Sequence, residues 1–435
     1  YLPQFIVFFI SLLSGMEKSL AHWKAEHPLL FISISIGVGY LIANYFSEHY
    51  AILNYTIAFF IIGISMGTLL CLPLFRLKKW QEGIFILFIL ISWGCVIYLT
   101  TQQQNLIWLP YPNGIISHIR IWMIQKIDRH IIDNEASGFA KALLIGVKSD
   151  VDKNIIKAYT QLGIIHIIAI SGMHLDIIFK NLVFVTSHLP RKMFWRFIEL
   201  AIVLITVWIY TFIAFASPSV VRASIFFSLF FVGTFLNQPK YTLNCIAGGI
   251  LVILFFDIHS IYHIGLQLSY AAVIGIHLFY PVFNKMLPMD NPILSWMWSN
   301  LCITLSAQLT TLPILLYHFH QTSTLVIISN FMMVPLSTLL LYALIGLVIM
   351  PNHVGFSLHL GGQIQSYINV LNRLVLYFHQ NPIGTPLLIQ MSGRMVVGYY
   401  FWLLFVYIWL YKRKAKYLFY SLVIITLISL IKLFP

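Results

Sequence analysis

The chain has 435 residues, of which 60% are hydrophobic and only 9% are charged. Soluble globular domains carry about 25% charged residues, so the composition excludes an ordinary soluble domain. The net charge is +13. Nucleic-acid-binding proteins are often this basic, but here the basic residues gather in short clusters between apolar runs. That distribution is typical of the cytoplasmic loops of membrane proteins.

Apolar runs of the length that crosses a bilayer, roughly 17–25 residues, recur along the chain. They predict membrane-spanning helices at 29–46, 51–74, 83–99, 165–188, 197–215, 219–236, 241–256, 262–283, 294–317, 324–350, 394–411 and 417–434. Residues 354–379 are only moderately apolar, and they are expected either to cross inside the bundle or to lie at the membrane interface. The predicted fold class is an all-α polytopic membrane protein with roughly 11 to 13 transmembrane or membrane-embedded helices.

The sequence divides into three blocks. We expect N-terminal membrane helices over 1–99, a polar extracytoplasmic or interfacial helical segment over 100–164, and a larger membrane helix bundle over 165–435. Placing three basic clusters on the cytoplasmic side gives a consistent map in which residues 100–164 lie outside, and this map needs one more crossing between 351 and 393. The clusters are at 76–79, 191–196 and 412–416.

Two kinds of helix are predicted in the polar segment. Residues 111–134 resemble an interfacial helix, because Arg120 and Lys126 stand among Ile and Trp residues. Residues 135–146 and 152–163 predict a short extracytoplasmic helical hairpin.

The turn of that hairpin carries residues that typically end and begin helices. Gly146 is a natural C-terminal stop for the first helix. Ser149 and Asp150 are candidate caps for the second.

A costly group of polar residues lies within the apolar run at 165–188. The group is His166, Ser171, Gly172, His174 and Asp176. Polar side chains at membrane depth need partners, and they commonly mark a pathway or a site. A helix broken at Ser171 and Gly172 would expose backbone N–H groups, which attract anions.

Two other roles for these residues are open. Ser171 as a nucleophile with His174 as base would make an intramembrane hydrolase, although no carboxylate is placed to orient His174. A metal site from His166, His174 and Asp176 fits poorly, since their spacings of eight and two do not share one helix face. The cysteines lack CxxC spacing, and we expect them to be buried apolar residues, with no cofactor and no metal. They are Cys71, Cys95, Cys245 and Cys302.

Ser217 and Pro218 predict a helix start, with Ser217 as N-cap and Pro218 at the first helical position. Arg222 follows about one turn later. A cation there either extends to the lipid headgroups or points into a path for phosphates.

Polar residues recur at helical spacing on two later spans. One stripe is His263, Gln267, Tyr270 and His277, and the other is Asn300, Thr304, Gln308 and Thr311. A single polar residue in a span often joins two helices, whereas two whole stripes favour surfaces around a wet interior. Pro313 and Pro335 predict kinks, and Asn330 is a candidate partner for a backbone group freed by the second.

Several of these motifs, in this order, carry a family resemblance. They are ALLIG at 142–146, LGIIHIIAISGMH at 162–174, SPSVVRA at 217–223, GLQLSY at 265–270, QLTTLP at 308–313, YHF at 317–319 and NFMMVP at 330–335. Over about residues 140–340 the chain resembles the ComEC family of bacterial inner-membrane proteins, which carry transforming DNA into the cytoplasm.

The resemblance implies a membrane channel that takes up single-stranded DNA across the bacterial inner membrane. It implies that seven residues line or shape the path: His166, Ser171, Gly172, His174, Arg222, Gln267 and Gln308. The polar stripes and the second kink add His263, Tyr270, Asn300 and Asn330 as candidate lining residues.

The chain departs from the family pattern at three points. Asp176 stands where the family usually has Gly, and an acid there would repel DNA unless it pairs with a neighbour. The stretch before the helical hairpin is too short for the family's OB-fold segment. His318 and His320 give HxH, but Thr322 replaces the Asp of the nuclease motif HxHxDH, so we predict no nuclease activity in this chain.

The expected partners are single-stranded DNA and the lipid bilayer, with a separate DNA receptor and a separate nuclease. No GxxxxGKS or GxxxxGKT motif occurs, so an ATP-driven motor would also be a partner. Assembly into a homo-oligomer is an open alternative. Two other functions remain in view: a small-solute transporter, for which no inverted repeat is evident, and the hydrolase using Ser171 and His174.

Overall fold

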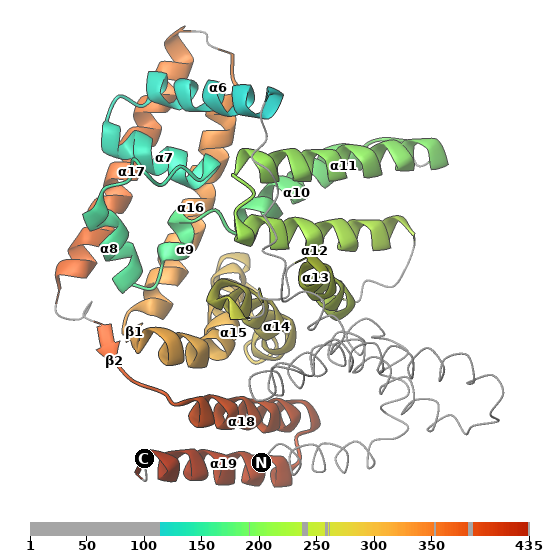
Figure 1. The fold of residues 1–435 in the computed structure, drawn as a ribbon, viewed down its shortest axis with the longest axis vertical. Helices are drawn as coiled ribbons and strands as arrows, with labels where there is room; N and C mark the ends of the chain where they lie inside the picture. Colours follow the sequence, from blue (N-terminus) through green and yellow to red (C-terminus); the bar gives the residue numbers. More distant parts are fainter. Residues whose placement is uncertain are drawn as a thin grey trace, which may run out of the picture. The chain divides into compact units, whose positions relative to one another are not determined.

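The structure is a computed structural model that describes residues 114–433, apart from residues 191, 237–241, 257–259, 261, 352–353 and 382–385. The helices are α6 Ile115–His130, α7 Asn134–Ile145, α8 Lys153–Gln161, α9 Ile165–Ile168, α10 Gly172–Thr186, α11 Met193–Ile213, α12 Pro218–Phe235, α13 Thr242–Phe256, α14 Ile264–Asn284, α15 Pro292–Phe319, α16 Val326–Ile349, α17 Val354–Gln380, α18 Gly393–Lys412 and α19 Ala415–Leu433 (Figure 1). The strands are β1 Gln321–Ser323 and β2 Pro386–Leu388. The spans predicted at 29–46, 51–74 and 83–99, the basic cluster at 76–79, Cys71 and Cys95 lie outside the described residues.

The described part of the chain confirms the all-α polytopic class. Six of its helices are long and apolar enough to cross a membrane, namely α11, α12, α14, α15, α16 and α18. Every span predicted after residue 190 coincides with a helix. The span predicted at 165–188 is broken into α9 and α10, and the break lies at Ala169–Ser171, beside the predicted position.

The contacts divide the chain into two units, residues 1–108 with 225–261 and residues 109–224 with 262–435. In the described part of the first unit, α13 and the second half of α12 are helical, and the rings of Phe226 and Phe230 stack along α12. All contacts described below belong to the second unit.

The largest core joins the polar segment to α16 and α17. Ile127, Leu143, Tyr159, Leu341 and Ile368 are fully buried in it, each from a different helix. Apolar residues of α17 recur at intervals of four, three and four, so they form one face of that helix. This face consists of Ile364, Ile368, Leu371 and Val375. The stretch 354–379 is therefore one helix whose apolar face packs on the polar segment and on α16.

Two cations of α6 cap the C-terminal ends of other helices. The Arg120 Nη1 donates to the carbonyl of Ile213, the last residue of α11, at 3.0 Å. The Lys126 Nζ donates to the carbonyls of Val348, at 2.9 Å, and Met350, at the end of α16. The last carbonyls of a helix lack intrahelical partners and carry its negative dipole end, so a cation is well placed there. Both side chains are buried, so these two cations contact protein groups, while the interfacial placement of α6 stays a prediction.

The contacts of Arg120 and Lys126 bear on the expected alternation of the spans. Five helices, α12 to α16, separate Ile213 from Ile349 in the chain. If each crossed, these residues would lie on opposite sides of a hydrocarbon core about 30 Å thick. The two cations that hold them lie only about 9 Å apart along α6. At least one of the five helices therefore does not cross.

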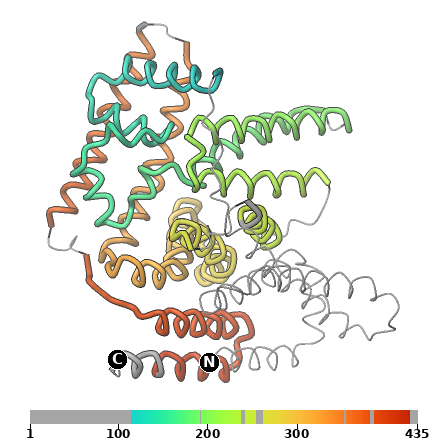
Figure 2. Tube along the Cα trace, viewed as in Figure 1, coloured from blue at the N-terminus to red at the C-terminus, as the bar shows by residue number. Residues whose placement is uncertain are grey.

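The small sheet points to α16 and α17 as the exception. β1 precedes α16, β2 follows α17, and the strands pair antiparallel with Gln321 opposite Leu388. The chain thus leaves the sheet along α16 and returns along α17, side by side with it and crosswise to α10 and α11 (Figures 1 and 2). Because α17 exposes Gln363, Ser366 and Arg373, we expect neither helix to cross. The described basic residues at 192–196, 285 and 412–416 then stay on one side.

Lys141 organises the turn between α7 and α8. Its Nζ lies 3.0 Å from Asp128 and 2.6 Å from Asp150, while its side chain is buried. Burial lowers the pKa of Lys141, but hydrogen bonds to the two carboxylates outweigh burial, so the pKa lies above its ordinary value. The hydrogen bonds from Lys141 and Ser149 lower the pKa of Asp150.

The cap of α8 differs from the expected one. The Asp152 carboxylate accepts the backbone N–H groups of Asn154 and Ile155 at 2.6 and 3.4 Å. Ser149 and Asp150 do not cap the helix, because Asp150 is engaged by Lys141. Gly146 ends α7 in the left-handed conformation at φ 81°, as predicted.

Tyrosines of α18 replace the hydrogen bond that Pro313 removes from α15. Proline has no N–H, so the Leu309 carbonyl four residues earlier loses its helical partner. The Tyr399 hydroxyl donates to that carbonyl at 3.1 Å, and the Tyr400 hydroxyl donates to the next one, of Thr310, at 2.8 Å. The proline thus creates the acceptor that docks α18 on α15.

Cysteine labelling tests the sidedness of α6 and α16. In a variant lacking the four native cysteines, we expect His118→Cys and Ile349→Cys to react from the same side with a membrane-impermeant maleimide. Phe194→Cys, at the start of α11, is the reference for the opposite side. Protection of position 349 together with 194 would mean that α16 crosses.

The Lys141 ion pairs predict an acid-sensitive contribution to stability. Asp150→Asn should lower the free energy of unfolding at pH 7 by about 0.5–1 kcal/mol, a small value because the carboxylate is partly exposed. The pKa of Asp150 is depressed, so this contribution is present above the unfolded carboxyl pKa and is lost as pH falls through the lower folded value. Melting of the detergent-solubilised protein at pH 7 and pH 3 measures the difference. The exposed Asp290→Asn is the control, and an effect that persisted at low pH would contradict the assignment.

A double-mutant cycle tests whether Tyr399 replaces the hydrogen bond that Pro313 removes from α15. Tyr399→Phe should cost about 1 kcal/mol, because it leaves the Leu309 carbonyl without a donor. In a Pro313→Ala background the restored backbone N–H fills that role, so the same change should cost less. Thermal unfolding of the four proteins gives the coupling, with the exposed Tyr411→Phe as control. Equal costs in both backgrounds would remove the proposed link.

Candidate functional site

The break between α9 and α10 is closed by a helix cap. The Ser171 backbone N–H donates to the His174 Nδ1 at 3.1 Å, and the Ser171 hydroxyl lies at the same distance from that nitrogen. His174 is fully buried. Since Nδ1 accepts a hydrogen bond, the neutral ring carries its proton on Nε2, and this N–H has no partner among the described residues. His166 lies within electrostatic range of it.

The start of α12 lies against this break. Helix α12 begins at Pro218, as its sequence predicts, and the Ser219 hydroxyl donates to the Ile170 carbonyl at 2.7 Å. A Cβ on Gly172 would lie 3.4 Å from the Ala223 Cβ, so the first turns of α10 and α12 approach closely. The motifs at 162–174 and 217–223 therefore form one structure.

Arg222 joins α12 to the first turn of α14. Its Nη2 donates to the Gly265 carbonyl at 3.1 Å. Its buried Nε has no hydrogen-bond partner in the described part of the chain, and neither has the hydroxyl of Tyr270, which lies within electrostatic range of the guanidinium. No carboxylate pairs with Arg222 in the part of the chain that the structure describes. The cation is thus fixed in place but not neutralised.

Around these helix starts, three hydrogen-bond donors have no acceptor among the residues that the structure describes. They are the His174 Nε2–H, the Arg222 Nε–H and the Tyr270 hydroxyl. Leaving a buried donor without an acceptor costs about 1–3 kcal/mol, so unpaired groups of this kind call for a specific explanation. Together with the N-termini of α10, α12 and α14, they suit an anion with several acceptor oxygens.

Asp176 is paired rather than free. Its carboxylate accepts a hydrogen bond from Lys180, one turn later on α10, at 2.7 Å. The acid at which the chain departs from the family pattern is therefore paired with a cation on the same helix.

The structure brings only part of the first polar stripe to this site. Tyr270 lies beside Arg222, and Gln267 is on the same turn of α14. His263 is the N-cap residue of α14 and is exposed. Further along α14, Gly275 allows Thr310 of α15 to approach its backbone.

The second stripe forms hydrogen bonds along its own helix. Asn300 donates to the Trp296 carbonyl, Thr304 to the Asn300 carbonyl, and Thr311 to the side chain of Gln308. Asn330 donates to the Val326 carbonyl at 2.7 Å, which is not a carbonyl freed by Pro335. That the two stripes line one cavity stays a prediction.

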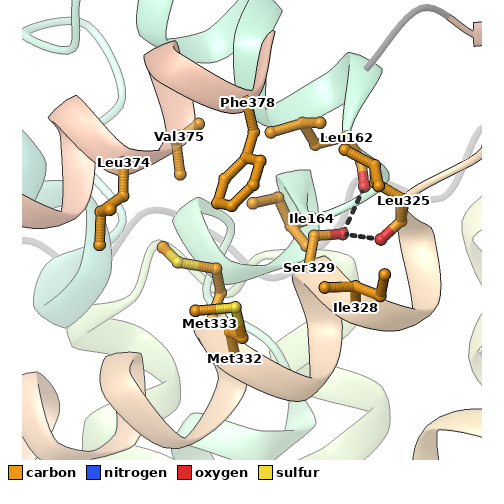
Figure 3. Close-up of a pocket in the computed structure, with 10 residues that line it drawn as sticks. All are labelled: Leu162, Ile164, Leu325, Ile328, Ser329, Met332, Met333, Leu374, Val375 and Phe378. Carbon is orange, nitrogen blue, oxygen red and sulfur yellow. Dashed lines mark hydrogen bonds between the residues drawn. The ribbon is translucent and has the colours of Figure 1, made fainter. Parts of the chain in front are cut away.

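A small cavity of about 20 Å³ lies elsewhere, between the start of α9 and helices α16 and α17. Its lining is almost entirely apolar, with Phe378 and Met333 directed into it and the Ser329 hydroxyl within hydrogen-bonding distance of the Leu162 carbonyl (Figure 3). A space of this size holds about one water molecule. It contains none of the expected site residues.

The geometry bears on the two other roles considered for these residues. The single lone pair of His174 Nδ1 accepts the Ser171 backbone N–H, so it is occupied and is poorly placed to take the hydroxyl proton. Among the described residues, no three His, Cys, Asp or Glu side chains are placed to hold a metal ion.

Sequence reasoning missed two groups that complete the site. The Gly265 carbonyl anchors Arg222, and Ser219 ties α12 to the break. Both belong to the motifs that carry the family resemblance, at 265–270 and 217–223, which was the available signal.

Comparison with known proteins agrees with these motifs. The model of the family described as "Competence protein" matches residues 143–413. The chain is also 26% identical, over 265 residues, to ComE operon protein 3 of Bacillus subtilis (strain 168); the match covers 58% of this chain and 33% of that protein. The chain thus spans about a third of the length of this relative. No solved structure matches. Because the family match covers more than half of the chain and includes every motif of the break, of α12 and of α14, the protein belongs to the competence protein family, the ComEC family that its motifs resemble.

Proposed function

We propose that this protein forms the membrane channel through which single-stranded DNA crosses the inner membrane during natural transformation. By family and composition, the chain is a multi-pass inner-membrane protein of bacterial competence, and its matched competence region is not an enzyme domain. The channel itself, and its lining, are the proposal.

The observation that carries the proposal is the group of three unpaired donors at the starts of α10, α12 and α14. Each nucleotide of a passing strand presents one negative charge and several acceptor oxygens. Arg222 offers a charge without a carboxylate partner, and His174 and Tyr270 offer neutral donors. We infer that a passing phosphate is the acceptor for these donors, and it would be released readily because only one of them is charged.

The remaining lining residues stay proposals of the same kind. Gly172 leaves the first turn of α10 without a side chain, and Ser171 and His166 border it. Gln267 lies one turn before Tyr270, while His263, Asn300, Gln308 and Asn330 would belong to the continuation of the path. DNA receptor, ATP-driven motor and nuclease are proposed as separate partners, and self-assembly as an open one.

Arg222 gives the sharpest test. Arg222→Ala should lower transformation by about tenfold or more without lowering the amount of protein in the membrane, because a lost charged hydrogen bond costs about 1.5–3 kcal/mol. Tyr270→Phe removes only a hydroxyl and should have a smaller effect in the same direction. Transformation frequency, normalised to protein abundance by immunoblot, is the measurement.

The control is Arg373→Ala, a cation exposed on α17. DNA bound at the cell surface should be unchanged in all variants, since the proposed step follows binding. A fall in transformation that only matched a fall in abundance would assign Arg222 to folding. Normal transformation in a deletion strain would reject the proposal.

A further inference from the structure

The link between α11 and α12 has an unusual backbone. Phe215 and Ala216 are consecutive and both have positive φ, 60° and 46°. Residues with a Cβ rarely adopt this conformation, because Cβ then crowds the following carbonyl. The link leads directly to Ser217 and so to the helix that carries Arg222. A strained turn next to a functional helix persists only where its surroundings hold it.

Arg120 of α6 is the group that holds this turn. Its guanidinium lies over the ring of Phe215, and its Nη1 donates to the Ile213 carbonyl at 3.0 Å. Arg120 is 6% exposed and Phe215 is 44% exposed, so a buried cation lies over a partly exposed ring. An arginine can stack and donate at the same time, because its donors lie in the plane of the guanidinium.

The turn transmits its position to the site through short connections. Ser219, three residues after Ala216, donates to the Ile170 carbonyl in the break before α10. One turn further, Arg222 donates to the Gly265 carbonyl. A change in how the chain leaves α11 would therefore move both contacts.

We propose that Arg120 is a positioning residue, which clamps the strained turn at Phe215 and Ala216 and thereby sets the place of Arg222 at the start of α12. This inference rests on the proposed function for its uptake readout. It assigns a role to a residue that precedes the matched family region, which begins at residue 143.

The end of α11 has a second support, which keeps Arg120 variants testable. The Tyr210 hydroxyl donates to the Leu144 carbonyl at 3.2 Å. The turn also closes on itself through the Ala216 N–H and the Thr211 carbonyl at 2.8 Å. Loss of Arg120 should therefore loosen the turn without undoing α11.

The test combines Arg120→Ala with Ala216→Gly, because glycine adopts positive φ without the Cβ penalty. Arg120→Ala should lower transformation per molecule by about tenfold, the population shift expected when one buried charged hydrogen bond is lost. Ala216→Gly should change little alone and should restore most of the loss in the double variant. Lys126→Ala is the matched control, since it removes the other capping cation of α6, and Ala216→Gly should not rescue it.

Melting of the purified protein supplies a readout independent of DNA. Arg120→Ala should lower the melting temperature and Ala216→Gly should recover part of it, whether or not the protein conducts DNA. Failure of the glycine to rescue either readout, or equal rescue of Lys126→Ala, overturns the clamp. Rescue of melting in a protein whose Arg222→Ala variant transforms normally would leave the clamp standing as a structural element, reject its role in uptake and reject the proposed function.

Discussion

Hydrogen bonds from side chains to backbone carbonyls join the helices of the described unit at helix ends, at a helix break and at a proline inside a helix. Arg120 and Lys126 donate to carbonyls at the ends of α11 and α16. Ser219 donates to a carbonyl in the break before α10, and Tyr399 donates to the carbonyl that Pro313 leaves free in α15. In a low-dielectric interior a carbonyl without a donor is costly, so each interruption of a helix creates an acceptor that some other segment must fill. The need of each buried carbonyl for a donor therefore accounts for both the helix breaks and the contacts between helices.

The same constraint gives the candidate site its meaning. Around α10, α12 and α14 the Ile170 and Gly265 carbonyls have found donors, but three side-chain donors have no acceptor among the described residues. The imbalance is one-sided: the surplus is of N–H and O–H groups, with one positive charge among them. A ligand that balanced it would supply oxygens and negative charge, as a phosphate does, whereas a cation or an apolar solute would leave the donors as they are.

The sequence predicted the helices because their limits are set by local chemistry. Apolar length fixed the spans, Pro218 fixed the start of α12, and Gly146 fixed the end of α7. It failed where a side chain's role depends on a distant partner. Arg120 and Lys126 among Ile and Trp suggest an interfacial helix, and only the fold places the ends of α11 and α16 beside them. Asp150 was expected to cap a helix, but Lys141, which is nearly buried, takes it and leaves the cap to Asp152. In the site, the break at Ser171 was predictable, whereas the anchoring of Arg222 on a carbonyl of α14 was not.

The position of Arg222 is unfavourable for stability taken alone. It lies near the N-terminus of α12, where the helix dipole is positive, and the N-termini of α10 and α14 lie close by. A cation placed among three positive helix ends raises the local potential, and one hydrogen bond to the Gly265 carbonyl offsets only part of the cost. The arrangement is instead suited to attracting a polyanion to the place where the helices begin, and the ion pair of Asp176 with Lys180 keeps the nearest acid on α10 from opposing it.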